Sequence, residues 1–270
     1  MSYEIELAAW RQQLDENLRR ENGWLALAGL FWLQQGVNAC GTADQLPVHL
    51  PNPAYPAHVA DFILEGETVR VRPTAANGQL LINGQPIADE FTLLPDISGT
   101  PTQIQLGDLA MVLIQRGPEF GVRLWDNGRA ERQTFPPRLW YAPNPDYRIL
   151  ATYNAYPTPT SFSIVNSVGM DLTMMAQGYL SFTLGGKSCR LEAPQEPTGE
   201  LFLSFKDGTN GRDTYLAGRY LLTSPPEGGI VTIDFNRAYN PPCAFTHFAT
   251  CPFPPRANYL SISVEAGERV

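Results

Sequence analysis

The stretch HVADFILEGETVRVRP, residues 58–73, decides the fold class. Apolar and polar residues alternate on both sides of Glu65-Gly66, and a period of two residues is typical of strands with one buried face. A glycine between two such runs predicts a β-hairpin. The same signal recurs in LLINGQPI (80–87), QIQLGDLAMVLIQRG (103–117) and SFTLGGKSCRLEA (181–193). We therefore expect a mainly β protein.

Further short strands are expected in GVRLWD (121–126), ELFLSFKD (200–207), YLAGRYLL (215–222), IVTIDFNRAY (230–239) and YLSISVEAG (259–267). The N-terminus differs, because residues 3–20 carry apolar side chains near helical spacing with charges between them. This pattern predicts a helix that stops near Asn22-Gly23, where glycine suits a C-terminal cap. The apolar segment GWLALAGLFWL (23–33) is too short to span a membrane and is expected in the core.

The order of these signals divides the chain into three predicted parts. Residues 1–35 hold the N-terminal helix and the apolar segment, 36–117 form a β-sandwich, and 118–270 form a C-terminal β domain, either a sandwich or barrel-like. The proline-rich and aromatic stretch 133–148 reads as an ordered connector, because its apolar content is high. Within it, LWYAPNPDYR (139–148) offers the aromatic and arginine side chains of a sugar or base platform, with core packing as the alternative.

Composition narrows the function classes. Of 270 residues 43% are hydrophobic and 17% charged, which favours a globular protein over a disordered one. The formal net charge of −8 argues against nucleic acid and membrane surfaces as partners, because both are anionic. The N-terminus lacks the basic start and apolar centre of a signal peptide. We therefore expect a cytoplasmic protein, in which free thiols are favoured over disulfides.

Four short features within residues 41–116 occur in an order that resembles a forkhead-associated domain, which is a β-sandwich. They are Gly41, His58 in PAHVADF, Asn83-Gly84, and Leu106-Gly107-Asp108. In that family, phosphothreonine is bound by an Arg soon after the early Gly and by a Ser before the His turn. The matching stretches GTADQLPVHL and PNPAYPAHV contain neither residue. Because a phosphate dianion needs charge-assisted donors, the resemblance implies the fold without phosphopeptide recognition.

A second resemblance covers the whole chain. It rests on GWLALAGLFWLQQGVNACG (23–41), GVRLWD (121–126), DTYLAGRYLL (213–222), DFNRAYNPPCAF (234–245) and ATCPFPPRANYLSISVEAGE (249–268). These motifs resemble the bacterial family known as domain of unknown function 1684, and the resemblance implies no activity. One position departs from the pattern, since His247 stands where the family more often has Pro, Glu or another polar residue. This departure weakens any mechanism based on His247.

The C-terminal motif DFNRAYNPPC gathers the candidate site residues. Strand alternation in TIDFNRAYN places Asp234 and Asn236 on one face, and alternation in DTYLAGRYLL places Arg219 beside Tyr215. The prolines after Asn240 fix the backbone there, so the surroundings are expected to be rigid. The predicted ligand-binding set is Tyr215, Arg219, Asp234, Asn236, Arg237, Tyr239 and Asn240.

Two functions and a purely structural role are consistent with that set. The first function is a ligand-binding or assembly protein with a rigid polar pocket at the motif, whose partner is a small molecule. The second is a hydrolase of a small polar substrate, with Asp234 as acid or base and Arg219 or Arg237 steadying an anion. The structural role is an ion pair from Arg219 or Arg237 to Asp234 that braces the fold.

Cys243, His247 and Cys251 have the spacing C-x3-H-x3-C. A zinc site needs a fourth ligand or a water, and the paired C-x-x-C signal of structural zinc is absent from the sequence. A catalytic Cys243 would need His247 as its base. The same spacing is compatible with a disulfide between Cys243 and Cys251, and with two buried neutral thiols. No cofactor is expected.

Overall fold

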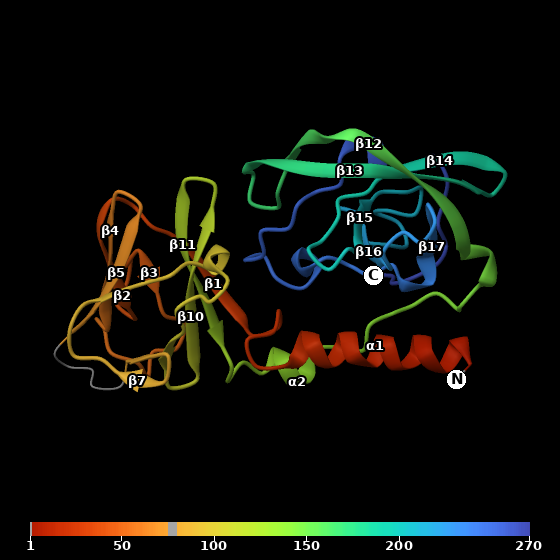
Figure 1. Ribbon diagram of the computed structural model, residues 1–270. Helices are drawn as coiled ribbons and strands as arrows, with labels where there is room; N and C mark the ends of the chain where they lie inside the picture. The colour runs from red at the N-terminus through yellow and green to blue at the C-terminus, as the bar shows by residue number, and fades with distance from the viewer. Residues whose placement is uncertain (1, 75–79) are drawn as a thin grey trace. The chain divides into compact units, whose positions relative to one another are not determined.

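The computed structural model describes residues 2–74 and 80–270 and divides the chain into two compact units (Figure 1). We call Glu16–Phe135 the sandwich unit, and Met1–Asp15 together with Pro136–Val270 the C-terminal unit. The chain is mainly β, in several sheets, with a helix at its N-terminus, as the sequence predicts. Residues 75–79 of the predicted sandwich lie outside the described residues. Among the described residues, the helices lack the combination of length and hydropathy that a membrane-spanning helix needs.

Helix α1 (Tyr3–Arg19) occupies the predicted helical range. The chain leaves it through Asn22, whose φ of 55° is the left-handed conformation of a helix C-terminus. Gly23 has a different role, because a Cβ there would lie 2.7 Å from the carbonyl oxygen of Leu18. The glycine therefore allows the chain to pass close to the end of the helix, and the capping conformation belongs to Asn22.

The sandwich unit contains a six-stranded and a five-stranded sheet. The first has the order β1-β11-β10-β9-β6-β7, with β1 Leu27–Trp32, β11 Glu119–Asp126, β10 Leu109–Arg116, β9 Ile104–Leu106, β6 Leu81–Ile82 and β7 Gln85–Pro86. The second has the order β3-β2-β4-β5-β8, with β3 Val48–His49, β2 Gly36–Gly41, β4 Ala60–Glu65, β5 Thr68–Pro73 and β8 Phe91–Thr92. The short elements η1 (Asp96–Ser98) and α2 (Glu131–Thr134) complete the unit.

One apolar core joins the two sheets of the sandwich. It contains Phe62 and Val71 from one sheet and Met111 and Val122 from the other. The predicted hairpin of residues 58–73 is β4 paired with β5, closed by a turn in which Gly66 has a φ of 60°. Strands β1 and β11 lie outside residues 36–117 yet belong to the same sheet as β10, so the sandwich extends on both sides of that range.

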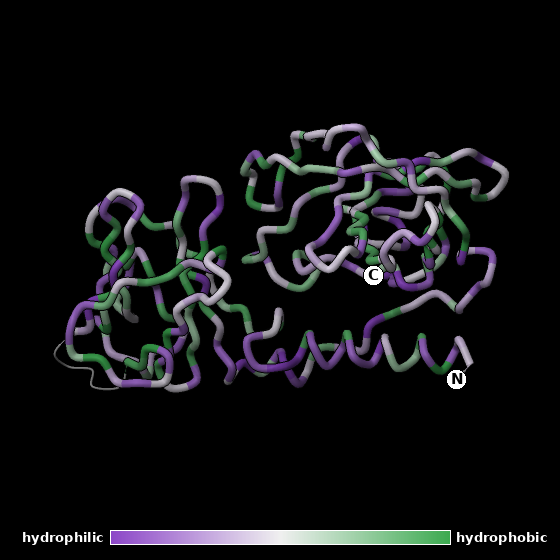
Figure 2. The backbone as a smooth tube through the Cα atoms, viewed as in Figure 1, coloured by the Kyte–Doolittle hydropathy of each residue, from purple (hydrophilic) through white to green (hydrophobic). Residues whose placement is uncertain are grey.

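The C-terminal unit is built on a four-stranded sheet of order β14-β13-β12-β17 and a two-stranded sheet of β15 and β16. The strands are β12 Arg148–Val165, β13 Asp171–Leu184, β14 Lys187–Glu192, β15 Leu201–Phe205, β16 Arg219–Thr223 and β17 Ile230–Asp234. The unit also contains short 3-10 turns: η2 Pro145–Tyr147 before β12, and η3 Phe235–Arg237, η4 Pro242–Ala244 and η5 Arg256–Asn258 after β17. A second apolar core, which includes Leu180, Phe205 and Ile233, packs the two sheets together. Figure 2 shows the apolar residues of these strands in green.

The prediction of a strand in YLSISVEAG (259–267) is wrong. Residues 259–267 are all described, and they form only an isolated bridge, between Tyr259 and Lys206. Side chains satisfy part of this backbone instead, because Val264 donates its N–H to Asp207 Oδ1 (3.1 Å) and accepts at its carbonyl from Arg219 Nη2 (2.9 Å). The alternation in the sequence therefore indicates that one side of this segment is buried, but it does not indicate that the segment is a strand of a sheet.

Candidate functional site

The polar pair Asp234 and Asn236 comes together through a turn. Strand β17 ends at Asp234, whose side chain accepts the N–H of Asn236 (3.2 Å) at the start of η3. Asn236 Nδ2 also donates to Asp234 Oδ1 (3.1 Å). Strand alternation predicts this pairing for the wrong reason, because the strand does not continue past Asp234.

The Asp234 carboxylate is engaged by three residues of its own chain. Tyr3 Oη donates a hydrogen bond to the carboxylate, at 3.0 Å from Oδ1 and 2.8 Å from Oδ2. Asn236 donates to the same group, and Arg237 Nε lies 3.7 Å from Oδ2. The Asp234 side chain is 12% exposed. This carboxylate therefore has structural partners on each oxygen.

Aromatic and cation–π contacts hold the first part of α1 within the C-terminal unit. The Trp10 ring meets Trp140 and Tyr239 edge-on, with centroids 5.8 Å and 6.4 Å away. The Arg11 guanidinium lies 4.5 Å from the centre of the Trp140 ring, and that of Arg237 lies 5.6 Å from the centre of the Trp10 ring. Such cation–π contacts strengthen with desolvation. Arg237 and Tyr239, both predicted as ligand-binding, thus contact the N-terminal helix.

Replacing Tyr3 should change how stability depends on pH. Burial, and then the hydrogen bond to Asp234, raises the pKa of Tyr3 from 10.0 to about 12. A folded-state pKa above the unfolded value gives stability that is complete below pH 10 and is lost as the pH rises to about 12. We expect the free energy of unfolding of the wild type to fall more steeply across this window than that of Tyr3→Phe.

Chemical unfolding at a series of alkaline pH values measures this difference. Other tyrosines also titrate there, so only the difference between wild type and variant is interpreted. Tyr259→Phe is the control, because Tyr259 is 50% exposed. Parallel pH profiles for wild type and Tyr3→Phe would contradict the proposed docking role of the Tyr3 hydroxyl.

Arg219 is a buried brace. Its side chain is 0% exposed, and Nη2 lies 2.8 Å from Asp207 Oδ2, whose side chain is also 0% exposed. The guanidinium further donates to the carbonyls of Val264 and Ala266. Of the two predicted pairs, the one from Arg237 to Asp234 is present at 3.7 Å, whereas Arg219 pairs with Asp207 and not with Asp234. Arg219 and Tyr215 do not form a shared ligand surface, since Arg219 is enclosed.

The remaining predicted residues also bind their own chain. Tyr215 Oη donates to the carbonyl of Cys243 (2.9 Å). Asn240 is buried; its backbone N–H donates to Glu268 Oε2 (2.7 Å), and its Nδ2 donates to the carbonyl of Arg269 (3.0 Å). Glu268 in turn accepts from Arg138 Nε (2.7 Å). The prolines after Asn240 thus stand beside a buried polar network.

Asn236 connects the motif to a pocket. It is fully buried, and its amide exchanges two hydrogen bonds of 2.9 Å with the backbone N–H and carbonyl of Asn144. Asn144 begins the turn η2, where its Oδ1 accepts the N–H of Asp146 (2.9 Å). The motif therefore fixes the loop that forms one wall of the pocket.

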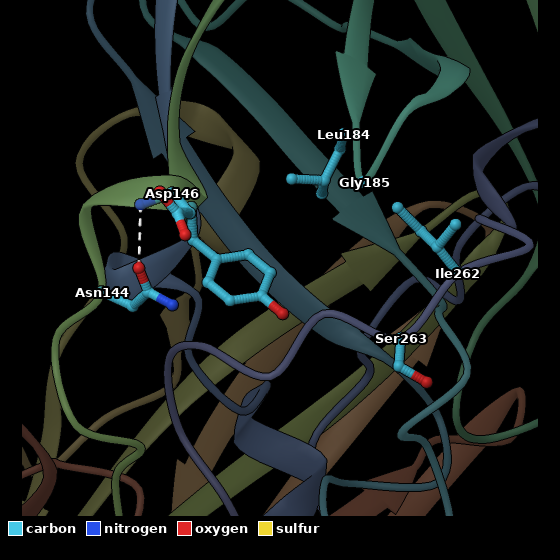
Figure 3. A pocket seen from close by; sticks show the side chains of 7 residues that line it. Asn144, Asp146, Leu184, Gly185, Ile262 and Ser263 are labelled. Carbon is cyan, nitrogen blue, oxygen red and sulfur yellow. Dashed lines mark hydrogen bonds between the residues drawn. The ribbon is translucent and has the colours of Figure 1, made fainter.

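This pocket has a volume of about 360 Å³. Figure 3 shows Asn144 and Asp146 on one side, Leu184 and Gly185 of the β13–β14 turn on another, and Ile262 with Ser263 on a third. Tyr147 also lines it. A more open depression of about 700 Å³ lies over strands β12, β13 and β14.

None of the seven predicted ligand-binding residues lines the smaller pocket. Its walls come from three segments that are far apart in sequence, so local sequence patterns do not predict that they meet. One signal was present, because the aromatic and polar segment 139–148 contains Asn144, Asp146 and Tyr147. The sequence predicts only structural elements for the Gly185-Gly186 turn and the segment 259–267.

Cys243 and Cys251, two of the three candidate metal ligands, lie together. Both are free thiols, and Cys243 donates its backbone N–H to Cys251 Sγ (3.2 Å). His247 is exposed. Among the described residues no three His, Cys, Asp or Glu side chains are grouped so that they could hold a metal ion.

Comparisons with solved structures found an uncharacterized protein from Haloarcula marismortui, 35% identical, with a TM-score of 0.44, covering 52% of this chain and 80% of that chain. An FHA domain studied for phosphothreonine-dependent interactions is 14% identical, with a TM-score of 0.26, covering 36% of this chain and 92% of that one. Mycobacterium tuberculosis EmbR in complex with a low affinity phosphopeptide is also 14% identical, with a TM-score of 0.26. This match covers 44% of this chain and 29% of that chain.

No match was found among curated proteins. One family model matches residues 133–269, which hold most of the C-terminal unit and the whole DFNRAYNPPC motif. The chain belongs to the family described as protein of unknown function (DUF1684).

Proposed function

We propose that the C-terminal unit binds a small polar organic molecule in the pocket of about 360 Å³ between η2, the β13–β14 turn and residues Ile262–Ser263. The supporting observation is the convergence of a carboxylate, amide and hydroxyl groups with apolar side chains in one concave site. Small-molecule sites in proteins have volumes of about 300–1,000 Å³ and combine a few placed polar groups with apolar walls. The site thus lies beside the C-terminal motif, to which Asn236 links it.

The rigid setting of the walls supports binding. Asn236 holds Asn144 by two hydrogen bonds, and the carbonyl of Ile262 accepts the N–H of Gly208 (2.8 Å). A Cβ at Gly208 would lie 2.7 Å from Ser263 Oγ, so the glycine allows the segment of Ser263 to approach closely. A site held in its binding geometry loses less conformational entropy when a ligand binds.

The lining groups indicate the chemistry of the ligand. Asp146 supplies a carboxylate, which accepts hydrogen bonds from an ammonium or hydroxyl group. Ser263 and Tyr147 add hydroxyl groups, and Leu184 and Ile262 add apolar surface. We therefore propose a small molecule that carries an ammonium or hydroxyl group on a short apolar body.

The alternative proposal is a hydrolase with Asp234 as acid or base, and it requires that Asp234 first lose a contact within its own chain. Tyr3 and Asn236 both donate hydrogen bonds to the Asp234 carboxylate, and Tyr3 is the first residue of helix α1. A substrate would have to displace Tyr3 before Asp234 could exchange a proton with it. Binding at the smaller pocket needs no such displacement, and we favour it for this reason.

Binding of choline and of its neutral isostere 3,3-dimethylbutan-1-ol tests the proposal. We expect saturable binding of choline, followed by NMR shifts of Asp146, Gly185 and Ser263, and weaker binding of the isostere. Asp146→Asn keeps the shape of the side chain and removes its charge. It should weaken choline binding about tenfold, because it removes the negative charge that attracts the trimethylammonium group and that accepts a hydrogen bond from the choline hydroxyl.

Asp171→Asn is the matched control, because Asp171 is an exposed carboxylate of the same unit outside the pocket. It should bind choline as the wild type does. If choline, ethanolamine and glycerol all fail to shift the pocket resonances saturably, the proposal is wrong. An equal loss of binding in both variants would mean that general surface charge, and not the pocket, attracts the cation.

A further inference from the structure

The thiols of Cys243 and Cys251 are neighbours in the fold. The backbone N–H of Cys243 donates to Cys251 Sγ at 3.2 Å, and this nitrogen is only two bonds from the carbon that carries the Cys243 thiol. Seven residues, 244–250, separate the two cysteines in sequence. The intervening loop therefore folds back and brings its two ends together, as a disulfide between them would require.

The surrounding structure holds both ends of this loop. Ser167 donates its N–H to the carbonyl of Cys251 (2.8 Å), and its Oγ accepts the N–H of Cys251 (2.9 Å). At the other end, Tyr215 Oη donates to the carbonyl of Cys243 (2.9 Å). The proximity of the thiols is thus fixed by contacts with the turn after β12 and with the loop before β16.

The two thiols differ in access and acidity. Cys251 is buried, with 5% of its surface exposed, whereas Cys243 is only partly buried. The side chain of Cys251, and then that of Tyr215, lowers the pKa of the Cys243 thiol, although burial opposes this effect. The side chain of Cys243, and then burial, raises the pKa of the Cys251 thiol. An accessible thiol with a lowered pKa beside a buried partner is the arrangement of an attacking and a resolving cysteine.

We infer that Cys243 and Cys251 form a dithiol site that exchanges with small disulfides. The Cys243 thiolate attacks one sulfur of the small disulfide, forming a mixed disulfide and releasing one thiolate. The Cys251 thiol, losing its proton to solvent, then attacks the Cys243 sulfur of the mixed disulfide and releases the second thiolate. In total, the dithiol is oxidised by two electrons to a Cys243–Cys251 disulfide, and the small disulfide is reduced to two thiols.

Oxidised glutathione, added to the fully reduced full-length protein, is the probe. We expect the intact protein to lose the mass of two hydrogen atoms, and peptide mapping under non-reducing conditions to place the bridge between Cys243 and Cys251. A reducing dithiol should restore the starting mass. Because the bridge restricts the unfolded chain, oxidation should also raise the melting temperature of the C-terminal unit by roughly 5 °C.

Two variants separate the steps. Cys251→Ser should stop the reaction at a stable glutathione adduct on Cys243, because no resolving thiol remains. Cys189→Ser, which removes a half-buried thiol elsewhere in the unit, should form the bridge as the wild type does. A wild-type protein that keeps all four thiols, retains the glutathione adduct, or forms its bridge with another cysteine overturns the inference.

Discussion

Replacing Arg219 with methionine is expected to lower the free energy of unfolding of the C-terminal unit by about 3–5 kcal/mol, the usual cost of leaving one member of a buried ion pair without its partner. The Asp207 carboxylate would keep its hydrogen bonds from Thr209 and Val264 but lose the only cation that faces it among the described residues. The carbonyls of Val264 and Ala266 would lose a donor as well. Hydrogen exchange at the amides of β15 and β16 measures this loss within the unit.

Two controls are needed to interpret this result: a double variant, and a variant of an exposed ion pair. Arg219→Met combined with Asp207→Asn removes the unpaired charge and should recover part of the lost stability. Arg212→Gln breaks the ion pair between Arg212 and Asp213, whose side chains are 64% and 33% exposed, and should change stability far less than Arg219→Met does. If Arg219→Met costs no more than Arg212→Gln, Arg219 is not the brace of this unit.

Replacing Phe235 with alanine is expected to cost about 3–5 kcal/mol, because it empties a fully buried position in a packed core. The Phe235 ring meets Phe205 edge-on at 5.4 Å and lies 6.0 Å from the ring of Phe182. Its neighbours Asp234 and Asn236 hold α1 and the pocket loop. The variant should therefore also loosen the hydrogen bonds of Asn236 with Asn144, which is visible as faster exchange of the Asn144 amide.

Two further variants check the Phe235 result by urea unfolding of the full chain. Phe235→Leu retains most of the buried volume, so it should cost clearly less than Phe235→Ala. Leu150→Ala removes an apolar side chain that is 72% exposed on the neighbouring strand β12, and should change stability by no more than about 0.5 kcal/mol. Equal effects of Phe235→Ala and Leu150→Ala would contradict the packing role.

The sequence predicted contacts among the polar residues of the C-terminal motif better than the partner of each residue. Asp234 and Asn236 do meet, and an arginine does brace the unit through a carboxylate. However, Arg219 pairs with Asp207, which lies in another segment, and one of the partners of Asp234 is Tyr3, 231 positions away in the chain. Alternation along one strand contains no information about either partner, because such pairs depend on which segments the core brings together.

The local pattern of the chain by itself determined the helix of residues 3–19 and most hairpins, because alternation and turn glycines act between residues that are close in sequence. Only the tertiary structure decided that Asn236 would hold Asn144, that three distant segments would enclose one pocket, and that Cys251 would lie against Cys243. It also left residues 259–267 without a sheet partner, since Asp207 and Arg219 satisfy part of their backbone. These contacts follow from burial of the two sheets around one core, which sets distances that no local spacing encodes.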